Sequence, residues 1–172
     1  SFSTTVGDAG VAGEVSVRRN NPLTSQGGVT VGNTAHAQVS MLYAMGRGPL
    51  WDASQIAAEL AWNRITSVRQ NGQFLDPLAA RDAFGFRVLF EPTWYQALPA
   101  LDISMPINLG YAPQGRSAVA PVGTHKGGDL TIGINGEYAK TWKFGLAYTH
   151  YFGSSAQMLV GATNYSNSFG QY

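Results

Sequence analysis

Charged residues are scarce in this chain of 172 residues. Asp, Glu, Lys and Arg together make up 12% of it, about half the share found in an ordinary soluble domain. Something other than charge must therefore solvate the surface. The formal net charge of +1 also gives no electrostatic reason to expect nucleic acid as a partner.

Cysteine is absent, which excludes a disulfide framework and thiolate metal sites. The chain also lacks an apolar run of about 20 residues, the length that a helix needs to cross a bilayer. If the protein spans a membrane, it must do so with strands, because only helices and closed barrels satisfy their backbone groups in lipid.

Glycine and aromatic residues are abundant instead, and a two-residue alternation organises them. From Leu101 to Tyr111, every odd position is large and apolar, and every even position is small or polar. This period predicts a strand with two unlike faces. Similar patterns predict eight strands in all, at residues 1–6, 10–20, 35–46, 54–69, 83–96, 101–112, 129–139 and 142–153. Residues 154–172 are predicted to form a final loop or tail.

Segment 54–69 also fits a helical spacing through Ala57, Ala61 and Ile65, although its alternation favours a strand. We treat the whole chain as one domain. The predicted class is all-β.

The connections between the predicted strands alternate in length. Residues 21–34, 70–82 and 112–128 are long connections, whereas 97–100 and 140–141 are short. Transmembrane barrels have short periplasmic turns and long outer loops, so we expect an antiparallel transmembrane β-barrel. Both chain ends then lie on the long-loop side, which predicts a fragment of about eight strands from a larger barrel. A soluble β-sandwich is the alternative fold.

The polar positions of the strands indicate which face would line the barrel. They are mostly Gly, Ser, Thr, Asn and Gln with a few charges, which suits a lumen better than the Lys- and Glu-rich outside of a soluble barrel. Such charges either pair and brace the barrel or line a path for solute. The candidates for lumen-facing charges are Glu14, Arg18, Glu59, Arg87, Glu91 and Glu137.

Aromatic residues on the apolar positions predict two belts at the membrane interfaces. The alternative is that these rings fill a soluble core. The periplasmic belt would contain Tyr43, Trp94, Tyr138 and Trp142, and the outer belt Phe84, Tyr111, Tyr148 and Phe152.

The three histidines do not form a recognisable catalytic or metal-binding pattern. His150 has the parity of the lipid-facing residues, His36 begins a strand, and His125 lies in a glycine-rich loop. No two of them have the spacing of metal ligands, and no Ser or Asp is placed beside them as in a hydrolase. We therefore expect neither an enzyme nor a metal or other cofactor.

Several segments resemble DUF1302, a Gram-negative family catalogued as a domain of unknown function. They are Gly13–Pro22, Phe90–Asp102, Gly127–Ile134 and Trp142–Gly153, and the sequence Glu91-Pro-Thr-Trp94 is the most specific part. The resemblance implies a large outer-membrane barrel, of which this chain matches the C-terminal portion. It also implies handling of hydrophobic molecules or lipids, because genes of the family often lie near those of an envelope lipoprotein and an efflux-type inner-membrane transporter.

The expected function is that of a passive conduit, or an export or import partner, for hydrophobic or amphipathic small molecules in the cell outer membrane. The alternative is a structural or interaction barrel with a plugged lumen, whose loops bind an envelope or extracellular partner. The expected partners are outer-membrane lipid, the envelope lipoprotein and the inner-membrane transporter.

Overall fold

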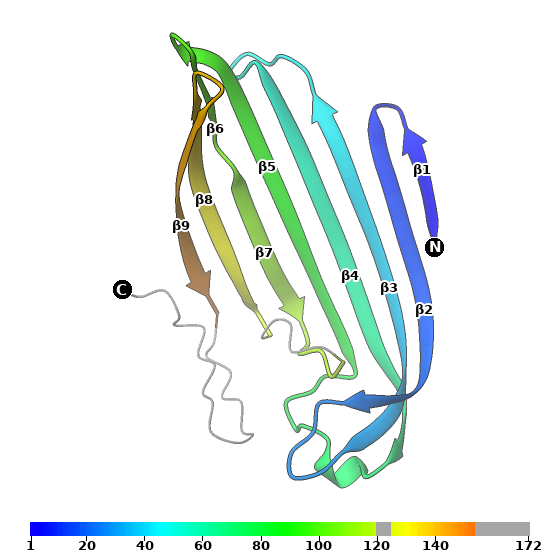
Figure 1. Cartoon of the computed structure of the whole chain (residues 1–172). Helices are drawn as coiled ribbons and strands as arrows, with labels where there is room; N and C mark the ends of the chain where they lie inside the picture. The colour runs from blue at the N-terminus through cyan, green and yellow to red at the C-terminus, as the bar shows by residue number, and fades with distance from the viewer. Residues whose placement is uncertain (120–124, 154–172) are drawn as a thin grey trace.

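The computed structural model describes residues 1–119 and 125–153, which form a single antiparallel sheet (Figure 1). The predicted all-β antiparallel fold is therefore confirmed. No helix in this described part is long and apolar enough to cross a membrane. The elements are β1 (Phe2–Val6), β2 (Ala9–Leu23), β3 (Thr30–Met45), β4 (Ala53–Gln70), the 3-10 turn η1 (Gly72–Phe74), β5 (Asp82–Leu98), β6 (Leu101–Ser104), β7 (Ile107–Gln114), β8 (Gly127–Tyr138) and β9 (Trp142–Phe152).

The strands follow one another across the sheet in chain order. β1 to β5 pair successively, β6 and β7 share the place between β5 and β8, and β9 pairs with β8. Segment 54–69, with its ambiguous spacing, lies within strand β4. Among the described residues, β1 pairs only with β2 and β9 only with β8, so the sheet has two open edges.

The sixth predicted strand is divided into β6 and β7 at Pro106, which has no N–H to donate to a neighbouring strand. The division does not shift the register. Ser104 pairs with Thr93 and Ile107 pairs with Phe90, so two residues lie between these pairs on either strand. β6 and β7 therefore act as one strand with a local gap in its hydrogen bonding.

The two ends of the sheet differ in their connections (Figure 1). At one end, which we call the turn end, lie residues 7–8, 46–52, 99–100 and 139–141. At the other, the loop end, lie residues 24–29, 71–81, 115–119 and 125–126. The turn-end connections at 7–8, 99–100 and 139–141 are short, but the one at 46–52 has seven residues, one more than the loop-end connection at 24–29. The alternation in length expected from the sequence is therefore only partly present.

The register sorts the side chains onto two faces, because directly paired residues of neighbouring strands point to the same side. Glu59 pairs with Arg87, and the face that they share is the polar face. Leu60 pairs with Phe86, and the opposite side is the apolar face. The alternation read from the sequence therefore extends across the strands, with local register shifts in the pairs β2–β3, β3–β4, β5–β6 and β5–β7.

The apolar face is exposed. Val15, Trp142 and Leu146 have 74%, 70% and 81% of their surface accessible, and no described segment forms a second layer over them. Water-soluble proteins rarely leave so large a contiguous apolar surface open to solvent.

Buried residues gather instead at the loop end. Leu23, Ile65 and Ala118 form a small core there, against which Leu75 and Ala79 pack. These residues come from all three loop-end connections or the strands beside them, so the connections are packed together.

Three aromatic rings on the apolar face lie over glycines of the neighbouring strand. A Cβ added to Gly136, for example, would lie 2.3 Å from Cζ of Phe144. The missing side chain therefore makes room for the ring, an arrangement that pins the register of paired strands. The three pairs are Phe2–Gly13, Phe144–Gly136 and Phe152–Gly128.

Candidate functional site

A hollow of about 620 Å³ lies on the polar face toward the loop end, and we call it the loop-end hollow. Its floor is formed by residues with small side chains, which leave the space above the backbone empty. Ala61 and Gly85 are directly paired on β4 and β5, and Ala83 and Gly110 extend the floor along β5 and onto β7. The floor is thus uncharged and mostly apolar.

An ion pair crosses the floor beside Gly110. Nη2 of Arg87 on β5 lies 2.9 Å from Oδ1 of Asp129 on β8, and Nη1 lies 3.4 Å from Oδ2. The two side chains meet above the intervening strand β7, where a Cβ added to Gly110 would lie 2.8 Å from both of them. Glycine at this position therefore permits the contact.

Two further charges line the loop-end hollow without such a partner. Arg18 on β2 and Glu59 on β4 both border it, and neither forms an ion pair with another residue of the described part. His36 lies between them, with Nε2 3.4 Å from Oε1 of Gln38. Within the part of the chain that the structure describes, the hollow thus contains one cation and one anion that form no ion pair.

Residues 115–119 cover the loop-end side of this hollow, and we call them the strap. Gly115, Ser117 and Val119 all line the hollow. Oγ of Ser117 donates a hydrogen bond to Oδ1 of Asn63, on the polar face of β4, at 3.2 Å. The strap therefore crosses the polar face instead of extending away from the sheet.

The strap is fixed mainly by a buried ion pair. Nη2 of Arg116 lies 3.1 Å from Oδ2 of Asp76, and these side chains are only 12% and 5% exposed. Oδ1 of Asp76 also accepts a hydrogen bond from the backbone N–H of Leu78 at 2.9 Å. Backbone hydrogen bonds from Thr24 to Ala118 and from Ala80 to Arg116 complete the attachment.

A second hollow, of about 800 Å³, lies on the polar face toward the turn end, and we call it the turn-end hollow. Its lining includes Gln55, Glu91, Thr93, Ser104 and Asn135. Nε2 of Gln55 donates a hydrogen bond to Oε2 of Glu91 at 2.8 Å. This hollow is more polar than the first.

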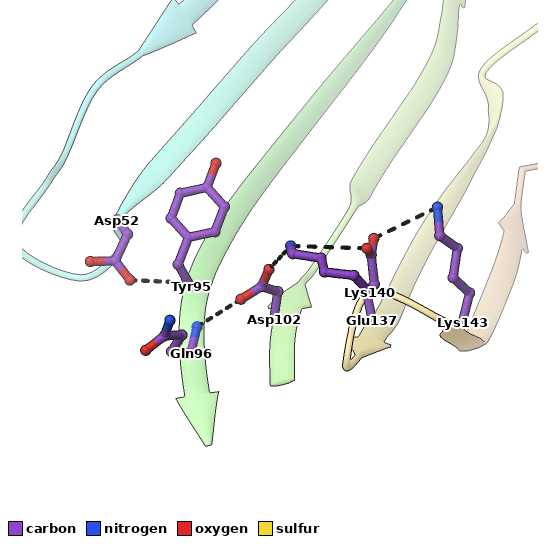
Figure 2. A network of polar contacts seen from close by, with 7 residues as sticks. All are labelled: Asp52, Tyr95, Gln96, Asp102, Glu137, Lys140 and Lys143. Carbon is purple, nitrogen blue, oxygen red and sulfur yellow. Dashed lines mark hydrogen bonds and ion pairs between the residues drawn. The ribbon is translucent and has the colours of Figure 1, made fainter. Parts of the chain in front are cut away.

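Figure 2 shows the charged network at the rim of the turn-end hollow. Nζ of Lys140 lies against Oδ2 of Asp102 and 3.9 Å from Oε1 of Glu137, and Nζ of Lys143 lies 3.6 Å from Oε2 of Glu137. Asp102 also accepts a hydrogen bond from the backbone N–H of Gln96 at 2.8 Å. The hydrogen bond to Asp102 raises the pKa of Lys140, which lies in the turn outside the strands.

The register places all the candidate lumen charges on the polar face, but only some of them contact a partner. Arg87 and Glu137 form ion pairs, and Glu91 is bonded to Gln55. Glu14, Arg18 and Glu59 have no ion-pair partner among the described residues. Which of these charges brace a barrel and which line a path for solute stays a prediction.

Sequence reasoning missed the partner carboxylates Asp102 and Asp129. Both have the parity of the polar face, since Asp102 pairs with Glu137 and Asp129 pairs with Gly110. The alternation could have identified them. It could not have identified Lys140, because a turn residue has no strand parity.

The candidate belt residues all have apolar-face positions. At the loop end, Phe86, Tyr111 and Phe152 are in contact, with ring centroids 6.0 Å apart in the first pair and 5.9 Å in the second. At the turn end, Nε1 of Trp94 donates a hydrogen bond to the carbonyl oxygen of Leu50 at 2.6 Å.

Tyr43 and Tyr148, which were assigned to different belts, fall in one row of paired residues across the sheet. Only a tilt of the strands to the membrane would set them at different depths. The two belts stay a prediction.

His150 lies on the apolar face, where its ring stacks on Phe152 with centroids 6.4 Å apart. It is therefore on the opposite side of the sheet from both hollows. Residues 1–119 and 125–153 contain no group of three or more His, Asp or Glu side chains that could hold a metal ion. The tail at 154–172 lies outside the described residues.

A family model described as "Protein of unknown function (DUF1302)" matches residues 1–170 of the chain. Comparison with curated proteins gave no match, and comparison with solved structures gave none.

Proposed function

The chain belongs to the DUF1302 family, and we propose that it forms part of a transmembrane β-barrel that conducts hydrophobic or amphipathic small molecules passively across the outer membrane of a Gram-negative cell. The observation that carries this proposal is the separation of side chains by the sheet. One face is apolar and exposed, and the other is polar and hollowed.

The exposed apolar face supports a membrane location. Three residues of this face are at least 70% exposed and lie near opposite edges of the sheet. They are Val15, Leu146 and Trp142. Each would bring a large hydrophobic side chain into contact with water in a soluble protein, whereas lipid solvates it without cost. The lipid of the outer membrane is therefore the proposed partner of this face.

The open edges at β1 and β9 support a barrel that is larger than the described sheet. A lipid-exposed edge would leave backbone N–H and C=O groups without hydrogen bonds. In the proposed barrel, strands from the remainder of a longer chain pair with these edges. The described sheet is then one segment of the wall.

The hollows support a conduit. An uncharged floor at Ala61, Ala83 and Gly85 can contact the apolar part of a passing molecule, while Arg18 and Glu59 face the same space. Passage along such a surface needs no covalent chemistry, so we propose no catalytic residue. An envelope lipoprotein and an inner-membrane transporter remain proposed partners, through the family resemblance.

A structural or interaction barrel with a plugged lumen is the second candidate. The pairs Arg87–Asp129 and Lys140–Asp102 favour it, because paired charges can brace a lumen across several strands. Solute flux through the purified full-length protein in liposomes separates the two functions. A conduit gives flux above that of protein-free liposomes, and a plugged barrel does not.

The membrane location is tested by cysteine scanning of the full-length protein in membranes, from Phe84 to Trp94 on β5. This chain has no cysteine, so each replacement introduces the only thiol of the segment. Phe86 and Arg87 are a matched pair of neighbours on opposite faces. We expect a lipid-soluble probe to label the alternate positions that include Phe86, and a water-soluble probe to label those that include Arg87. Labelling of both faces from water would refute the proposal.

A further inference from the structure

The strap, residues 115–119, lies over the loop-end hollow, and its place there is unlike that of an ordinary surface loop. Ala118 is 1% exposed and Ser117 is 6% exposed. Loops that connect strands normally run over the surface and stay solvated. A connection that is buried against the polar face must therefore be held there by specific contacts.

The contacts hold the strap at both of its sides. On one side, Ser117 donates a hydrogen bond to Asn63 of the sheet. On the other, Arg116 forms its ion pair with Asp76 in the connection between β4 and β5. The carbonyl oxygen of Ala118 accepts a hydrogen bond from the backbone N–H of Thr24 at 2.7 Å, which ties the strap to the connection between β2 and β3.

The root of the strap is also constrained. Gly115 has a φ of 71°, and a Cβ placed on it would lie 2.0 Å from the backbone oxygen of Asp82. Only glycine fits this close approach, so the chain turns inward directly after β7. Gly115, the first residue of the strap, thus permits its inward course.

We propose that the strap is a fixed constriction that limits the size of the molecules entering the loop-end hollow, and that Asp76 and Arg116 are the residues that position it. This inference rests on the proposed conduit, since it names what selects the solute at that same site. Val119 and Ser117 form the wall that an entering molecule meets. The size limit is set by the wall, and its rigidity by the ion pair.

The test measures access to the floor beneath the strap. A cysteine replaces Ala61, and the full-length protein in intact cells is treated from outside with a small maleimide or with one carrying a bulky polymer. With the strap in place, we expect the bulky reagent to react much more slowly than the small one. Asp76→Asn removes the charge that holds Arg116 and should raise the ratio of bulky to small labelling several-fold.

Asp82→Asn is the matched control, because Asp82 pairs with Arg64 at the same end of the sheet but is 31% exposed and lies on the apolar face. It should leave the ratio unchanged. If Asp76→Asn does not fold, as judged by its circular dichroism, Val119→Gly decides the question, because it trims the wall and leaves the ion pair intact. It too should raise the ratio.

An unchanged ratio in the folded strap variants overturns the constriction, as does a bulky reagent that labels the unaltered protein as fast as the small one. Solute flux in liposomes is measured separately. A shifted labelling ratio without flux would refute the conduit and retain the constriction. Flux with an unchanged labelling ratio would support the conduit and refute the constriction.

Discussion

Removal of the Asp76 carboxylate should loosen the loop end far more than removal of a carboxylate from an exposed pair. Asp76 and Arg116 are 5% and 12% exposed, and Nη1 of Arg116 is buried without a hydrogen-bond partner in the described part. Asp76→Ala would therefore leave a buried and uncompensated charge, which typically costs about 3–5 kcal/mol. Asp82→Ala acts on a pair that is 31% and 41% exposed, where the expected cost is about 0–1 kcal/mol.

Amide hydrogen exchange of the full-length protein in detergent measures this difference locally. The backbone N–H groups of Thr24, Asp76 and Ala80 are hydrogen-bonded within the loop end, so they report its opening. Asp76→Ala should accelerate their exchange by roughly a hundred-fold to a few thousand-fold, because about 1.4 kcal/mol corresponds to a factor of ten. Combining it with Arg116→Ala should cost less than the sum of the single changes. Equal acceleration by Asp82→Ala, or strict additivity in the double variant, would refute the reasoning.

The remaining predictions concern the two faces near the turn end. Gly136→Ala should destabilise the protein by about 1–3 kcal/mol, because the new Cβ would overlap the ring of Phe144. Adding Phe144→Ala should relieve the overlap. Guanidinium unfolding measures the stability of both variants. The pKa of Lys140 is raised in the folded state by the hydrogen bond to Asp102. The stability difference between the unaltered protein and Lys140→Met should therefore be small at neutral pH, and it should vanish when the pH exceeds the usual pKa range of lysine. The pair contributes while Lys140 is protonated and is lost as the pH rises through that raised pKa. A difference that persisted after Lys140 lost its proton would contradict this explanation.

The strands could be predicted from the sequence because their signal is local. In the segment from Leu101 to Tyr111, alternation alone separates the apolar from the polar positions. The same argument assigned segment 54–69 to a strand in spite of its helical spacing, since Ile56, Ala58, Leu60 and Trp62 alternate with more polar residues, and the segment lies within β4. Pro106 limited the prediction only at its own position, where the missing N–H divides the strand without shifting its register.

The partners of charges could not be predicted in the same way. Arg87 and Asp129 are 42 residues apart and meet across a third strand, so their contact depends on two registers and on the glycine at position 110. The strap is a harder case. Residues 112–128 were expected to form a long outer loop, and only the tertiary contacts of Asp76 and Thr24 bring part of that loop onto the polar face.

The unbroken register between β4 and β5 also determines where the chain can gain or lose residues during evolution. An insertion of a single residue within β4 would exchange its two faces beyond that point, which would place side chains such as Trp62 on the polar face and Asn63 on the apolar face. Connections usually absorb such changes. At the loop end, however, the hydrogen bond from Thr24 to Ala118 couples the length of one connection to that of another. Single insertions and deletions should therefore accumulate in the turn at 46–52, and the loop end should change only by several concerted events.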